Sequence, residues 1–173
     1  LDGSHVTLLV ESPRGYANLC RLLTAAHAGT RPKPTDPVPP ALDRHVLASH
    51  HEGLICLSGC ARDGLAVRNA NGAAELAAVF GRDRFFVELQ RPYERGDARR
   101  NNRLRQLAET IGVQTVATGN VHAHNRRRAL LQDAMVAIRH RGSLEAAEQE
   151  RRGNHECVLM TPEQVFERFP QDR

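Results

Sequence analysis

Two histidines separated by one residue are the first candidates for chemistry in this chain. His122 and His124 follow the apolar run 113–118 and a Gly119-Asn120 pair. In an extended segment, side chains two residues apart point to the same side, which suits two ligands of one metal or of adjacent metals. Nine histidines in 173 residues also make a chance spacing of this kind unremarkable. We interpret His122 as a metal-ligand candidate, and His124 either as a second ligand or as an exposed loop residue.

Cys60 is the second candidate, because it follows the apolar run Leu54–Leu57 through Ser58-Gly59. A cysteine thiolate is a soft metal ligand and a nucleophile. The alternative, which the spacing alone favours, is a small buried hydrophobic residue. No two of the four cysteines form a C-x-x-C pair, which argues against a zinc ribbon. The cysteines are therefore expected to be reduced thiols of a cytoplasmic protein.

Three consecutive arginines, Arg126, Arg127 and Arg128, follow the His122 loop. A guanidinium presents a fork of donors that fits phosphate oxygens, so these residues are candidates for contact with nucleic acid. The alternative, which we favour from the pattern, is the solvated first turn of a helix. The net charge of +4 is compatible with nucleic acid, but a genome that prefers arginine codons explains it equally well, since Lys33 is the only lysine.

Strand and helix signals alternate along the chain. Strands are expected at 6–10, 54–57, 85–89, 113–118 and 157–160, and helices after Ser12-Pro13, at 41–50, from an Asn71 cap to Phe80, at 99–111, at 129–141 and after a capping box at Thr161. This alternation predicts an α/β fold with a mostly parallel sheet covered by helices, either a barrel or a doubly wound sheet. Five prolines between residues 30 and 40 predict an exposed, extended loop.

The predicted sheet sets where these candidates lie. In a parallel α/β fold the functional side chains collect at the carboxyl ends of the strands. Cys60 and His122 both satisfy this rule. His5 comes before its strand, so it would lie at the opposite end unless an earlier strand precedes it.

Several motifs, taken in order, resemble one family. The stretches His5-Val6-Thr7-Leu8-Leu9-Val10, Gly15-Tyr16-Ala17-Asn18-Leu19-Cys20-Arg21-Leu22, Glu52–Cys60, Phe85–Gln90, Ala117–His122 and Leu159–Gln164 are similar to segments of bacterial DNA polymerase III alpha subunits. The run Leu131-Gln132-Asp133-Ala134-Met135 and the segments Ala117-Thr118-Gly119 and Ala123-His124 lean toward the error-prone relatives. The resemblance spans nearly the whole chain.

The resemblance implies a PHP domain, a distorted TIM-like barrel of seven β/α units, present here as an N-terminally truncated portion. It implies that residues 1–173 are one PHP-domain fragment, with the polymerase core and the first H-x-H motif lying outside it. By position, His5, Cys60 and His122 match metal ligands of the family, and Asn120 falls on an aspartate. Because asparagine carries no charge, we expect a vestigial site with low occupancy by zinc or manganese, and we expect His5, Cys60, Asn120 and His122 to converge.

Two classes of function follow from the resemblance. In the first, the chain is a mainly structural part of an error-prone DNA polymerase that uses magnesium for DNA-templated DNA synthesis in damage-tolerant replication and repair. In the second, it is a metal-dependent phosphoesterase or exonuclease. An amidohydrolase is a weaker third reading of the H-x-H spacing, because those enzymes carry that motif on their first strand. Expected partners are DNA, a sliding clamp and mutagenesis accessory proteins, in the cytoplasm; no apolar run approaches membrane-spanning length.

Overall fold

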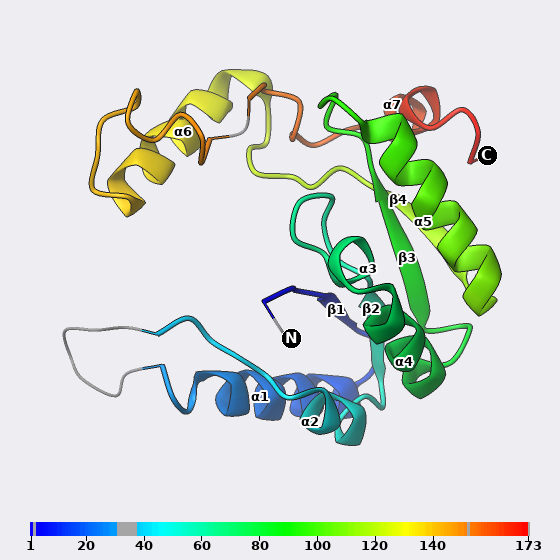
Figure 1. The fold of residues 1–173 in the computed structure, drawn as a ribbon. Coiled ribbons are helices and arrows are strands. Elements are labelled where there is room, and N and C mark those ends of the chain that lie inside the picture. Colours follow the sequence, from blue (N-terminus) through cyan, green and yellow to red (C-terminus); the bar gives the residue numbers. More distant parts are fainter. Residues whose placement is uncertain (2, 31–37, 152, 173) are drawn as a thin grey trace. The chain divides into compact units, whose positions relative to one another are not determined.

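The structure is a computed structural model that describes residues 1, 3–30, 38–151 and 153–172. Figure 1 labels its α-helices and strands. They are β1 (Thr7–Val10), α1 (Pro13–His27), α2 (Arg44–Ser49), β2 (Leu54–Leu57), α3 (Leu65–Arg68), α4 (Ala70–Phe80), β3 (Phe85–Gln90), α5 (Asp97–Ile111), β4 (Gln114–Thr118), the 3-10 turn η1 (Arg126–Arg128), α6 (Ala129–Arg139) and α7 (Pro162–Arg168). The backbone divides into two compact units, residues 1–88 with 102–116, and residues 89–101 with 117–173. Most of the proline-rich segment, residues 31–37, lies outside the described residues.

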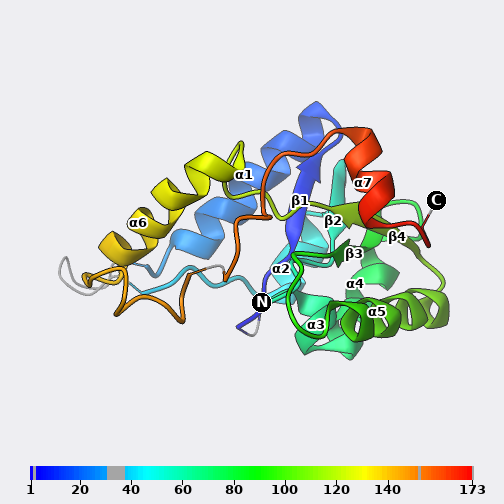
Figure 2. The ribbon, with the colours of Figure 1, turned by 90° about the horizontal axis from the view of Figure 1, so that it is seen from above.

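The four strands form one sheet in the order β1-β2-β3-β4. β2 and β3 pair in parallel, with Cys56 opposite Phe85, as the alternating pattern predicts. β1 departs from that pattern, because it runs antiparallel to β2 with Thr7 opposite Leu57 (Figure 2). The prediction of a mostly parallel sheet allows one antiparallel strand but did not indicate that it would be β1, since strand direction depends on the connection between strands and not on the composition of either strand.

The core of the first unit is mostly aliphatic, with the buried rings of Phe80 and Phe85. The side chains of Leu54, Cys56, Leu65, Phe85 and Val87 are fully buried. Such continuous burial along β2 and β3 is typical of parallel strands covered on both faces, and helices α3 and α4 lie on the connection between these two strands.

Helix α1 begins as predicted. The Ser12 side chain accepts a hydrogen bond from the Gly15 N–H, and Pro13 occupies the first turn. The predicted cap of α4 is wrong: the Asn69 side chain, and not Asn71, accepts from the Gly72 N–H at 2.9 Å, so the helix begins two residues earlier.

A close backbone approach explains part of the Gly-Tyr-x-x-Leu motif. A Cβ placed on Gly15 would lie 1.8 Å from the Gly53 carbonyl oxygen, so only glycine fits here. The buried Asn18 side chain, one turn further along α1, donates to the Glu52 carbonyl at 2.9 Å. These two contacts fix α1 against the segment that leads into β2.

In the second unit, α7 begins with the predicted capping box between Thr161 and Gln164. The predicted strand at 157–160 is wrong, because the only bridge there is an isolated pair between Ala123 and Val158. Within the described part of the chain, every helix is too short or too polar to cross a membrane.

Candidate functional site

His5 and Cys60 lie side by side, although 55 residues separate them in the sequence. The Cys60 backbone N–H donates to His5 Nε2 at 3.2 Å. His5 is held by a bridge to Gly64 and by a hydrogen bond from its own N–H to the Asp63 carbonyl at 3.1 Å. Because β1 is antiparallel to β2, the start of β1 meets the carboxyl end of β2. His5 thus reaches Cys60 without any earlier strand, which corrects the expectation from sequence.

The positive φ of Gly59 makes this approach possible. Gly59 has φ +91°, and a Cβ there would lie 2.2 Å from the His5 carbonyl oxygen. The loop after β2 can therefore fold over the start of β1 only with glycine at this position.

The two side chains change each other's pKa. Burial alone raises the pKa of the Cys60 thiol, but hydrogen bonds from His5 and from the backbone N–H groups of Asp63 and Arg62 bring it down to about 7. The hydrogen bond with Cys60 in turn raises the pKa of His5, against the opposing effect of burial. Near neutral pH a large fraction of Cys60 can therefore be thiolate. Cys60 is only half-buried, so it is not the fully buried small residue that the alternative interpretation expected.

We expect iodoacetamide to alkylate Cys60 with a rate that rises through a midpoint near pH 7, because the thiolate is the reactive form. In His5→Ala, which removes the hydrogen bond and the charge, the midpoint should move up toward the ordinary thiol value. Peptide mass spectrometry in the presence of a chelator measures the rate at Cys60. Cys20, an exposed cysteine on α1, is the internal reference, and its profile should be the same in both chains. Coincident Cys60 profiles with and without His5 would contradict the pairing.

Glu88 is a residue of this region that sequence reasoning missed. It is buried on β3, with 6% of its surface exposed, and its backbone N–H donates to Ser58 Oγ at 2.9 Å. Its charge contributes to raising the pKa of His5, and adds to the burial that raises the pKa of Cys56 to about 12. A carboxylate inside the apolar run Phe85–Gln90 was the available signal, since a buried charge in a strand needs a partner.

Asn120 and His122 form a separate pair in the second unit. His122 Nε2 lies 3.2 Å from the Asn120 side-chain oxygen, and the His122 backbone N–H donates to the Cys157 carbonyl at 2.8 Å. Asn120 adopts φ +45°, a left-handed conformation that asparagine tolerates better than most residues. The H-x-H spacing does not bring both rings to one site: His122 lines a small cavity with His155, whereas His124 lines an open cleft.

A complete metal site is not formed by the described residues. A catalytic zinc commonly takes three protein ligands, and nowhere in the described ranges do three His, Cys, Asp or Glu side chains come together. His5 and Cys60 supply one nitrogen and one sulfur donor, which is an incomplete set. We therefore derive no chemical step through a metal. Convergence of this pair with Asn120 and His122 stays a prediction.

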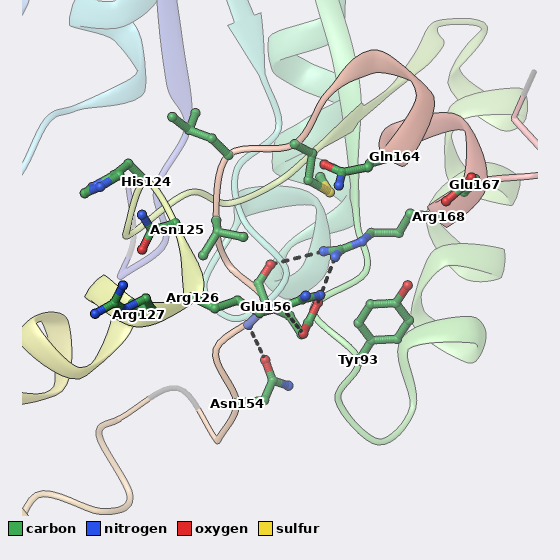
Figure 3. A pocket seen from close by; sticks show the side chains of 13 residues that line it. Tyr93, His124, Asn125, Arg126, Arg127, Asn154, Glu156, Gln164, Glu167 and Arg168 are labelled. Carbon is green, nitrogen blue, oxygen red and sulfur yellow. Dashed lines mark hydrogen bonds and ion pairs between the residues drawn. The ribbon is translucent and has the colours of Figure 1, made fainter.

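The arginines of the predicted phosphate-binding run differ in their contacts (Figure 3). Arg126 makes a two-pronged ion pair with Glu156, with Nε–Oε1 and Nη2–Oε2 distances of 2.9 and 3.0 Å. Arg127 lines the open cleft, and Arg128 is exposed on η1. Glu156 is also bound by the buried Arg168, whose Nη2 donates to Oε2 at 3.0 Å. Arg126 is thus held in an ion pair whose partner, 30 residues away, no sequence pattern indicated.

The chain has a mixed α/β fold with polar side chains at the ends of its strands. Comparison with known proteins identifies the family within this class. The PHP domain family model matches residues 1–92. The chain belongs to the PHP domain family. The residues matched include β1, β2 and β3 and the His5–Cys60 pair.

Curated relatives give the same assignment over more of the chain. An error-prone DNA polymerase of Symbiobacterium thermophilum is 35% identical over 96% of this chain and 17% of its own length. The DNA polymerase III subunit alpha of Thermus aquaticus is 32% identical over 99% of this chain and 14% of its own. An error-prone DNA polymerase of Anaeromyxobacter dehalogenans is 30% identical over 94% of this chain and 14% of its own length. The chain spans only 14–17% of these relatives, and is homologous to the PHP domains of this polymerase family.

Proposed function

We propose that the chain is part of the PHP domain of an error-prone enzyme of the DNA polymerase III alpha type, in which this portion is mainly structural. Similarity to an error-prone DNA polymerase over 96% of the chain carries the proposal. The parent would catalyse magnesium-dependent, DNA-templated DNA synthesis in the cytoplasm, meeting DNA, a sliding clamp and mutagenesis accessory proteins. The parallel β2–β3 pair, joined through α3 and α4, supports one barrel-like domain over residues 1–173, a truncated portion of seven β/α units.

The structural role is supported by the residues that this chain carries where the family has metal ligands. Asn120 lacks the carboxylate charge that the resemblance assigns to its position. His5 and Cys60 offer two donors, fewer than a catalytic zinc commonly takes from protein. Any binding of zinc or manganese by His5, Cys60 and His122 is therefore expected to be weak.

The alternative function is a metal-dependent phosphoesterase or exonuclease. One observation favours it: the Cys60 thiol, with a pKa of about 7, is ready to act as an anionic soft ligand at neutral pH. An added metal would then need His122 and further donors to complete its coordination.

One labelled primer–template assay separates the two functions. We expect the parent polypeptide to lengthen the labelled primer with magnesium and nucleotides, and the 173-residue chain neither to lengthen nor to shorten it with magnesium, manganese or zinc. The length of the labelled strand on a denaturing gel is the measurement. Shortening by the 173-residue chain that disappears in His122→Ala would establish the phosphoesterase. Failure of the parent to extend the primer would contradict the polymerase assignment.

A further inference from the structure

The open cleft of the second unit contains an aromatic ring that neither proposed function uses. The cleft encloses about 1120 Å³ and is lined by Tyr93, Arg127, Glu156, Arg168 and neighbouring residues. Tyr93 has a backbone φ of +60°, which is rare for an aromatic residue and persists only where the surroundings impose it. With 54% of its surface exposed, the residue presents its ring to the cleft rather than to a core.

Two guanidinium groups hold the ring in place. Arg168 Cζ lies 4.7 Å from the ring centroid and Arg91 Cζ lies 5.7 Å from it. Arg168 is itself buried and fixed by the Glu156 side chain at 3.0 Å and the Glu156 carbonyl at 3.2 Å. Figure 3 shows Arg168 bonded to Glu156, with the Tyr93 ring nearby. The ring therefore does not have to be ordered when a ligand arrives, which favours binding.

The lining of the cleft carries a small excess of positive charge. Three arginines and two glutamates line it, a net charge of +1 with histidine neutral. Glu156 is neutralised by Arg126 and Arg168. Arg127 has no hydrogen bond or ion pair within the described segments, so its guanidinium is available to a ligand.

We propose that this cleft binds single-stranded DNA, with one base stacked on the exposed part of Tyr93 and a backbone phosphate against Arg127. An exposed aromatic ring and a free cation that line the same cleft, as Tyr93 and Arg127 do, are the combination that single-strand sites use. A duplex fits less well, because its bases are already stacked on one another. The proposal goes beyond the polymerase assignment, since it requires neither DNA synthesis nor hydrolysis by this chain.

Tyrosine fluorescence can report the stacking directly. The chain has no tryptophan and two tyrosines, so in Tyr16→Phe the emission comes from Tyr93 alone. Titration of that chain with a short oligothymidine should quench this emission. An abasic strand of equal length, with the same phosphates, should bind more weakly and leave the emission unchanged. Equal quenching by both strands, or no quenching by oligothymidine at low salt, would overturn the proposal.

Affinity measurements with matched variants test each contact separately. Fluorescence anisotropy of a labelled oligothymidine should show a Kd for Tyr93→Leu at least about fivefold higher, the low end for loss of one stacked base. Tyr93→Phe should retain the affinity, as should Tyr16→Leu, which removes the other exposed tyrosine. Circular dichroism verifies that each variant is folded.

The phosphate contact has its own readout in the salt dependence. In Arg127→Ala the slope of log K against log salt should become shallower by about 0.7, the value for one phosphate of a single strand. Arg139→Ala, an exposed arginine at the end of α6 outside the cleft, removes the same charge and is the control. An equal change in both variants would show nonspecific attraction, and binding of poly-glutamate as tight as that of oligothymidine would indicate an acidic protein partner. Either result overturns the proposal while leaving the primer-extension result of the parent untouched.

Discussion

Replacing Gly59 with alanine should destabilise the first unit by about 2–6 kcal/mol. The left-handed φ of +91° costs a non-glycine residue about 1–3 kcal/mol. The added Cβ would also lie 2.2 Å from the His5 carbonyl oxygen and 2.7 Å from the Gly64 Cα. Both are backbone atoms that cannot rotate away, and overpacking of this kind costs about 1–3 kcal/mol more. Urea denaturation followed by circular dichroism measures the loss.

Gly29→Ala is the matched control, because a Cβ there meets nothing within 4 Å. It should change the free energy of unfolding by less than about 0.5 kcal/mol, as is usual for surface substitutions. Gly59→Ala should also move the alkylation midpoint of Cys60 upward, since the clash pushes His5 away from the thiol. Equal stability of the two glycine variants would show that the loop after β2 does not pass over the start of β1.

Replacing Phe85 with alanine should destabilise the chain by about 3–5 kcal/mol, the usual cost of removing a fully buried aromatic side chain. Phe85 has 0% of its surface exposed and opens β3 opposite Cys56, where β2 and β3 pair. The lost ring leaves a cavity against one face of two strands that are themselves buried, so the neighbours cannot collapse into it easily. The same urea titration measures this loss.

Phe166→Ala provides the comparison, because Phe166 lies on α7 with 53% of its surface exposed. We expect a loss below about 1 kcal/mol there, and an intermediate loss below about 1.5 kcal/mol for Phe85→Leu, which keeps most of the volume. A Phe85→Ala loss no larger than that of Phe166→Ala would contradict the parallel β2–β3 core.

The features predicted correctly depend on residues close together in the sequence. Ser12 caps α1 and Thr161 forms a capping box with Gln164, each through contacts spanning three residues. The apolar run Leu54–Leu57 forms a buried strand because its composition suits burial on both faces. Even local signals fail where two candidates compete, as with Asn69 and Asn71, since either asparagine can cap a helix.

The candidate site was predicted in its residues but not in its geometry. Motifs identified His5, Cys60 and His122, yet with β1 taken as parallel to β2 the start of β1 would lie at the opposite edge of the sheet from Cys60. Glu88 was not singled out, because its role rests on burial, and burial is a property of the folded chain. The Glu156–Arg168–Tyr93 arrangement was likewise not foreseen, since its members come from three separate segments.

The sequence by itself determined the order of the main elements, the caps of α1 and α7 and the family, because these follow from local hydrogen bonding, apolar spacing and short motifs. Only the tertiary structure decided that β1 runs antiparallel to β2, and therefore that His5 meets Cys60 across 55 residues. It also decided that Arg126 is held by Glu156, 30 residues away, while Arg127 faces an open cleft. Strand direction and ion pairs between distant residues depend on the path that the chain takes between the segments. The pattern within one segment does not indicate which other segment it will contact.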